Sequence, residues 1–147
     1  KKISSSVKNQ KKKEIKYGIN KISTYRKFAK RVKLSKKKLK KIFLKIILND
    51  KKIIGYGVTA KSTTILNYCK IGNDLVSYFI DTTKAKQNKY TPGTKIPIFK
   101  YPGFIEKDID FVFLGAWNFK KEIFKKEKNF IKRGGKFIIH TPTPKIL

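Results

Sequence analysis

The hydrophobic and polar positions follow one pattern in the first third of the chain and another in the rest. From Ser23 to Ile46, apolar side chains recur at alternating intervals of three and four residues, and lysines fill most positions between them. This spacing predicts an amphipathic helix, or a broken pair of helices, with Ser23 or Thr24 as N-cap and an end near Asn49. Residues 1–18 show no sustained periodicity and are predicted to be a mobile or inter-domain segment.

The rest of the chain alternates short apolar runs with longer amphipathic stretches. Strands are predicted at residues 52–55, 76–80, 96–99, 110–114 and 136–139, and helices at residues 60–70 and 119–133. Glycines 134 and 135 are predicted to end the second helix. Strands that alternate with helices of this length indicate β–α units, a mainly parallel sheet and right-handed crossovers. The pattern therefore predicts an α/β domain over residues 51–147, preceded by a helical segment at 19–50.

Lysine dominates the composition. The chain carries 38 Lys plus Arg against 9 Asp plus Glu, a formal net charge of +29, yet only Arg26, Arg31 and Arg133 are arginine. Proteins that contact phosphates and bases rely on arginine, whose planar guanidinium makes bidentate contacts. Two interpretations stay open: compositional drift toward Lys and Ile, or selection for polyanion binding by the lysine face of residues 26–52.

Several classes of protein are disfavoured by the sequence. No apolar run approaches the roughly 18–20 residues of a membrane-spanning helix, and no apolar signal-peptide core follows the basic start. A cytoplasmic location without a membrane partner is therefore expected. Cys69 is the only cysteine, which excludes an intrachain disulfide and a cysteine-based zinc site. The absence of methionine, even at position 1, leads us to expect a segment of a longer protein.

The carboxyl ends of the predicted strands are the expected binding edge, because ligands of open parallel sheets lie there. The candidate residues are Gly55, Tyr56 and Gly57 after the first strand, Lys61 on the next helix, Asp81 after the second strand, Trp117 and Asn118 after the fourth, and His140 after the last. A glycine turn that leads into a helix presents N–H groups and a positive helix end to a phosphate, and Lys61 adds a charge. Alternatively, the glycines only make a tight turn.

The other candidates also have structural interpretations. Asp81 stands where dinucleotide folds keep the acid that binds a ribose, or it caps the following loop. Trp117 and Asn118 stack on and hydrogen-bond a ring, or they pack the edge of the sheet. His140 is the only histidine, and a lone histidine is more often structural than a ligand. Cys69 is expected in the core rather than as a nucleophile.

Two phosphate-binding motifs fail at the same position. The run Gly55–Ser62, GYGVTAKS, departs from both the G-x-x-x-x-G-K-S loop and the G-x-G-x-x-G fingerprint, because Ala60 replaces the last glycine. Nucleoside-triphosphate hydrolysis is not expected, whereas dinucleotide binding, which sometimes accepts alanine there, is weakened rather than excluded. No paired carboxylates, metal-ligand cluster or Ser-His-Asp arrangement stands out, so neither catalytic residues nor a metal site are assigned.

Four blocks of sequence, in order within residues 19–145, resemble one known family. They are Ile54–Tyr68 (IGYGVTAKSTTILNY); Lys86-Gln87 through Thr91–Thr94 to Ile96–Ile98 (KQ, TPGT, IPI); Ala116–Phe119 with Glu122-Ile123 (AWNF, EI); and Gly134–Ile138 (GGKFI). The chain resembles the carboxy-terminal domain of S-adenosylmethionine-dependent sugar C-methyltransferases. Its Lys-rich helix is similar to the segment that precedes that domain.

The resemblance implies a Rossmann-like three-layer fold with a mainly parallel sheet, preceded by the Lys-rich amphipathic helix. It implies a longer enzyme with an amino-terminal zinc domain and a central methyltransferase domain that binds S-adenosylmethionine, both outside this chain. Such an enzyme methylates a carbon of a nucleotide-linked keto-deoxysugar through an enolate, while this domain packs against the central domain and helps to hold the sugar nucleotide. Strand-end geometry would place the phosphates near Gly55, Tyr56, Gly57 and Lys61, and the sugar near Trp117, Asn118 and His140.

This sequence departs from the family pattern at three positions. Ser62 and Asn88 stand where the family commonly has glycine, and His140 stands where proline is usual, which affects loop shape more than fold. The leading hypothesis is a substrate-positioning domain of a sugar C-methyltransferase. The alternatives are a lysine-rich module that binds nucleic acid or another polyanion, and an independent nicotinamide-dependent enzyme.

Overall fold

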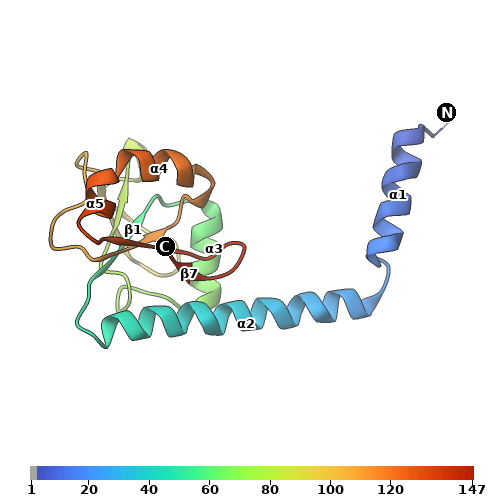
Figure 1. Cartoon of the computed structure of the whole chain (residues 1–147), viewed down its shortest axis with the longest axis horizontal. Helices are drawn as coiled ribbons and strands as arrows, with labels where there is room; N and C mark the ends of the chain where they lie inside the picture. Colours follow the sequence, from blue (N-terminus) through green and yellow to red (C-terminus); the bar gives the residue numbers. More distant parts are fainter. Residues whose placement is uncertain (1–2) are drawn as a thin grey trace. The chain divides into compact units, whose positions relative to one another are not determined.

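The computed structural model describes residues 3–147 and divides the chain into two compact units, one ending at Leu34 and one from Ser35 to Leu147 (Figure 1). The first unit holds helix α1 (Ser5–Tyr17), which the sequence pattern did not predict. Ser4 caps its start and Gly18, with φ 74°, ends it. No residue of α1 is buried, so its caps rather than an apolar stripe mark its bounds. Of the segment predicted to be mobile, residues 1 and 2 lie outside the described part.

Helix α2 (Ile22–Ile47) confirms the predicted amphipathic helix and is continuous over 26 residues. It begins at Ile22, so neither Ser23 nor Thr24 is its N-cap. Its buried residues are Leu39, Phe43 and Ile46, spaced by four and three positions along one face. This spacing places them over the sheet of the second unit, which is the helix packing that the alternating pattern predicts.

The second unit contains a seven-stranded sheet in the order β3-β4-β2-β1-β5-β6-β7. The strands are β1 (Ile53–Tyr56), β2 (Phe79–Asp81), β3 (Lys89–Tyr90), β4 (Pro97–Lys100), β5 (Phe111–Leu114), β6 (Lys136–Ile139) and β7 (Lys145–Ile146). The five inner strands run parallel, and only the two-residue edge strands β3 and β7 pair antiparallel. The sheet confirms the predicted Rossmann-like α/β fold, although neither edge strand was predicted.

The fold has three layers, a sheet with helices on both faces, and one apolar cluster packs the helices against each face. On one face, α2 and helix α3 (Ala60–Cys69) pack on Phe79 and Phe113, with Cys69 buried as expected. On the other face, helices α4 (Lys120–Lys126) and α5 (Lys128–Lys132) pack on Phe137. Because both faces are covered, the inner strands consist of almost continuous apolar residues.

The single helix predicted over residues 119–133 is two short helices preceded by the 3₁₀ turn η2 (Trp117–Phe119). The break falls at Glu127, whose side chain is 3% exposed and accepts a 2.5 Å hydrogen bond from the Tyr101 hydroxyl. The helical periodicity of this segment predicts five buried side chains: Phe119, Ile123, Phe124, Phe130 and Ile131. Ile123 and Phe130 are buried and Phe124 is partly buried, but Phe119 and Ile131 are exposed. Helical periodicity alone does not predict this break, because the partner of Glu127 lies 26 positions away.

Candidate functional site

The strand order brings most of the candidate residues to one edge of the sheet. Strand β1 lies between β2 and β5, so the chain reverses its direction of winding there, and ligands of such sheets bind outside this switch point. A cavity of about 280 Å³ lies at this position, and its lining includes Tyr56, Gly57, Asp81, Lys86 and Lys126. The predicted turn and the predicted acidic residue therefore meet in one crevice.

The turn after β1 has no spare hydrogen-bond donors of its own. The N–H of Gly57 donates to the Ile80 carbonyl at 2.8 Å, and the N–H of Val58 donates to Asp81 Oδ2 at 2.7 Å. Gly57 adopts φ 76°, which favours glycine, whereas Gly55 is required because a Cβ there would lie 2.2 Å from the Phe79 ring. The prediction of unpaired donors at this turn is wrong, because both N–H groups already donate to oxygen atoms at the end of β2.

Helix α3 begins with a reciprocal cap that satisfies two further N–H groups. Thr59 Oγ1 accepts from the Ser62 N–H at 3.1 Å, and Ser62 Oγ accepts from the Thr59 N–H at 2.8 Å. Ser62 is fully buried, and this cap satisfies its hydroxyl within the turn. Within the described part of the chain, the N–H groups of Ala60 and Lys61 have no such partner. The positive end of the helix is therefore available at these two residues.

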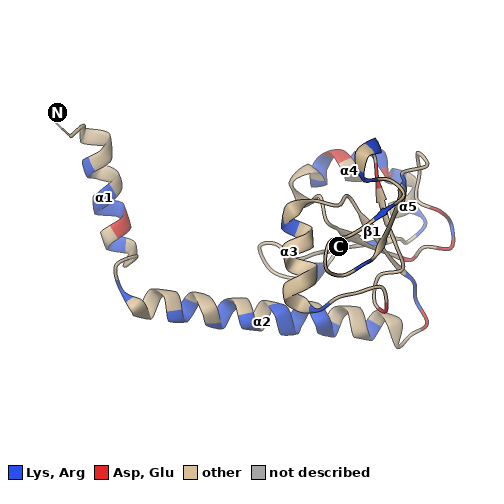
Figure 2. Ribbon diagram, turned by 180° about the vertical axis from the view of Figure 1, so that it is seen from behind, with Lys and Arg blue, Asp and Glu red and all other residues tan. Residues whose placement is uncertain are grey.

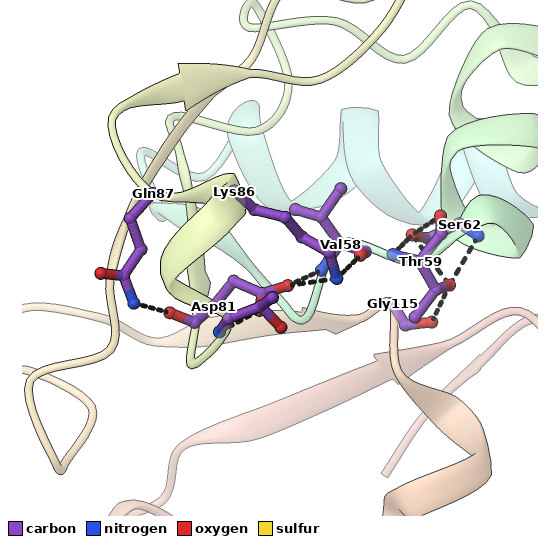
Figure 3. A network of polar contacts seen from close by, with 8 residues as sticks. Val58, Thr59, Ser62, Asp81, Lys86, Gln87 and Gly115 are labelled. Carbon is purple, nitrogen blue, oxygen red and sulfur yellow. Dashed lines mark hydrogen bonds and ion pairs between the residues drawn. The ribbon is translucent and has the colours of Figure 1, made fainter.

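Asp81 is held by the loop that follows it (Figure 3). Its carboxylate accepts the N–H groups of Val58 and Thr83, at 2.7 and 2.8 Å, and lies 3.3 Å from Lys86 Nζ. Its backbone carbonyl accepts the Gln87 side-chain amide at 3.0 Å. Burial alone would raise the pKa of the Asp81 carboxyl, but the Thr83 and Val58 donors and the Lys86 charge outweigh it and lower that pKa. Asp81 is a permanent anion near neutral pH. Sequence reasoning missed Lys86, although it stands in the KQ block.

Lys61, Trp117 and His140 form a second group at the same edge of the sheet. Lys61 Nζ lies 5.5 Å from the centroid of the Trp117 ring, and the Trp117 and His140 rings are 6.4 Å apart, edge to face. Asn118 follows on η2 and is exposed. Trp117 and Asn118 line a cavity of about 500 Å³. The structure thus brings together a cation, an indole and an imidazole from three separate segments, while Asn118 shares only the cavity with Trp117.

His140 is buried without a complete set of hydrogen bonds. Its side chain is 6% exposed and packs on the Phe113 ring, with centroids 5.6 Å apart. Within residues 3–147, its Nδ1 atom has no hydrogen-bond partner. Burial lowers the pKa of the imidazole, so the ring is neutral at neutral pH. A neutral imidazole both donates and accepts, which suits a hydroxyl or carbonyl group.

The burial of His140 makes stability depend on pH in a narrow range. The imidazole pKa is lowered from 6.5 in the folded chain, so the unfolded chain binds the proton more readily. We expect the free energy of unfolding to fall as pH decreases below about 6.5. His140→Asn should flatten this slope, because no other histidine titrates there. Urea denaturation at pH values from about 7 to 5 measures it; equal slopes in both proteins would contradict the expectation.

Tyr56 points into the core rather than toward an open surface. Its ring lies 5.3 Å from that of Tyr101, which is hydrogen-bonded to Glu127. Burial, together with the charge of Glu127, raises the pKa of Tyr56 to about 12, so the phenol stays neutral. Tyr56 therefore forms the inner wall of the 280 Å³ cavity.

The structure adds two observations on metals and membranes. Within residues 3–147, no group of three or more His, Cys, Asp or Glu side chains is arranged to hold a metal ion. In the same part of the chain, no helix combines the length and the apolar character that crossing a membrane requires.

The strand order and the residues at the switch point define a Rossmann-like α/β domain, and comparison with known proteins identifies its family. The family model described as C-methyltransferase C-terminal domain matches residues 1–142. The chain is also 32% identical over 130 residues to C-methyltransferase NovU of Streptomyces niveus, an alignment that covers 88% of this chain and 31% of NovU. The chain belongs to the C-methyltransferase C-terminal domain family, as its sequence blocks predicted. It spans less than a third of the curated relative that it matches.

Proposed function

We propose that this chain is the substrate-positioning domain of an S-adenosylmethionine-dependent sugar C-methyltransferase. It helps to hold a nucleotide-linked keto-deoxysugar while a central methyltransferase domain of the same longer protein transfers the methyl group. Family membership supports the methyltransferase context, and the 31% coverage of NovU supports a larger protein with further domains. The chain's own task is binding and orientation, for which we propose no catalytic residue.

The observation that carries this proposal is the group of Lys61, Trp117, Asn118 and His140 at the carboxyl edge. Lys61 Nζ and the two N–H groups at the start of α3 supply positive charge for a diphosphate. The Trp117 indole offers a face on which a base or sugar ring stacks. His140 and Asn118 add donors and acceptors for hydroxyl or keto oxygens.

The other four predicted residues shape the site rather than contact the ligand. Gly55 and Gly57 allow the turn to pack against Phe79 and Ala116, and Tyr56 and Asp81 support the turn from two sides. We propose that these four residues position the start of α3, so that Lys61 faces the substrate. Their substitution would then weaken binding indirectly.

The crevice of this domain does not fit S-adenosylmethionine. In Rossmann folds that bind NAD, the acidic residue after β2 hydrogen-bonds a ribose, the group that S-adenosylmethionine also carries, but here the Asp81 carboxylate is bonded to Val58, Thr83 and Lys86. We therefore assign the cofactor to the part of the longer protein outside this chain, and derive no step of the reaction through it.

An amide NMR titration with a thymidine diphosphate-linked deoxysugar tests the proposal. We expect shifts at the amides of Ala60 and Lys61 and at the Trp117 indole N–H, because these groups face the ligand, and none at Asp108, at the opposite end of the strands. Unchanged spectra at saturating ligand would refute the assignment.

A generic oligonucleotide of equal charge is the control for the polyanion alternative. Lysines and arginines lie along the helices α1 and α2, and others lie on the rest of the second unit (Figure 2). A nonspecific polyanion would therefore shift many lysine-rich segments, and that binding would fall steeply with salt. Binding of the sugar nucleotide that followed the same pattern would favour the alternative.

A further inference from the structure

The crevice at the switch point contains a hydrogen bond between two groups that a dinucleotide-binding protein uses for its ligand. In such proteins the N–H groups after the first strand meet a phosphate and the acidic residue after the second strand meets a ribose, so both are free to bind the ligand. Here these two groups are bonded to each other, because the Val58 N–H donates to Asp81 Oδ2 at 2.7 Å (Figure 3). The bond is buried, and the Asp81 side chain is 5% exposed.

Lys86, on the loop after β2, is hydrogen-bonded to both residues of this contact. Its Nζ donates to the Val58 carbonyl at 2.7 Å and to Asp81 Oδ2 at 3.3 Å. The carboxylate therefore receives a backbone N–H and an ammonium group, the two kinds of donor that a glycine turn and a lysine offer to a phosphate oxygen. A phosphate that entered here would have to displace Asp81, and would face its negative charge if it did not.

We propose that the Asp81 carboxylate is a built-in anion that fills the phosphate position of the β1–α3 turn and so excludes a free dinucleotide from this crevice. The proposal excludes the independent nicotinamide-dependent enzyme as a function of this chain. It also explains why the N–H groups that stay free for a substrate lie at Ala60 and Lys61 rather than at Val58. It does not depend on the proposed function, since it holds whether or not the edge binds a sugar nucleotide.

Removing the carboxylate should convert the turn into an open anion site. In Asp81→Ala, the Val58 N–H and the Lys86 ammonium lose their shared partner, and inorganic pyrophosphate can meet both. We expect pyrophosphate to shift the Val58 amide of this variant with at least about tenfold higher affinity than in the unchanged chain, because hydrogen bonds to charged groups are worth roughly 1.5–3 kcal/mol. Adding Lys86→Ala to Asp81→Ala should reverse most of the gain.

Asp81→Asn keeps the test valid if the alanine variant does not fold. Its side-chain oxygen still accepts the Val58 N–H, but the negative charge is gone, so pyrophosphate binding is expected to lie between those of the unchanged chain and Asp81→Ala. Equal affinity for pyrophosphate at Val58 in the unchanged chain and in folded variants would overturn the proposal. A Val58 shift on adding nicotinamide dinucleotide to the unchanged chain would overturn it as well. Neither result bears on the sugar-nucleotide titration at Lys61 and Trp117.

Discussion

Phe113→Ala is expected to lower the free energy of unfolding by about 3–5 kcal/mol, the usual cost of removing a buried phenylalanine side chain. Phe113 is fully buried on β5. Its ring lies 5.6 Å from that of Phe43 on α2, 6.3 Å from that of Phe79 on β2 and 5.6 Å from that of His140. The alanine therefore leaves a cavity where α2, β2, β5 and the residue that follows β6 meet.

Trp117 fluorescence during urea denaturation measures this loss in the second unit alone, because the chain has one tryptophan. Since small domains have only about 5–15 kcal/mol of stability, the variant should unfold at a much lower urea concentration. Phe104→Ala is the matched control, as Phe104 is 60% exposed and its loss should change stability by no more than about 0.5 kcal/mol. Similar losses in both variants would show that Phe113 does not join the layers.

Trp117→Ala is expected to weaken binding of the sugar nucleotide about tenfold to a hundredfold. Stacking of a ring on an aromatic side chain contributes roughly 1–3 kcal/mol when tested by alanine substitution, and each 1.4 kcal/mol is a factor of ten in affinity. The loss should be large because Trp117 also holds Lys61, whose ammonium lies over its ring. Isothermal titration calorimetry with the thymidine diphosphate-linked sugar measures it.

Two control variants separate stacking from general damage. Trp117→Phe keeps an aromatic face and should retain most of the affinity. Phe104→Ala removes an exposed aromatic ring that lines a different cavity from Trp117, and should leave the affinity unchanged. If Trp117→Ala bound the ligand as tightly as the unchanged chain, the indole would serve only to pack the edge of the sheet.

Elements with a strong local signal were predicted well. The apolar run before His140 predicted residues 136–139, and β6 has these bounds. The amphipathic stretch at 60–70 predicted α3 to within one residue, because a cap at Thr59 and a left-handed residue at Lys70 limit it. The short edge strands β3 and β7 were missed, since two-residue strands have no hydrophobic period to detect.

The candidate site was predicted less completely, because its chemistry depends on pairs that are distant in sequence. Residue order placed Asp81 at the end of β2, but left open whether it binds a ribose or supports a loop. The hydrogen bond from Val58, 23 positions away, shows that it supports the turn. In the same way, only the packing of β5, β6 and α3 brings Trp117, His140 and Lys61 together.

The sequence by itself determined the class of fold, the family and the edge of the sheet at which the candidate residues gather, because periodicity, glycine positions and motif blocks are local properties. Only the tertiary structure decided which N–H groups remain free for a ligand. A hydrogen-bond donor near Asp81 bonds to that carboxylate only when β1 and β2 lie side by side, and this pairing is a property of the folded sheet rather than of any short segment.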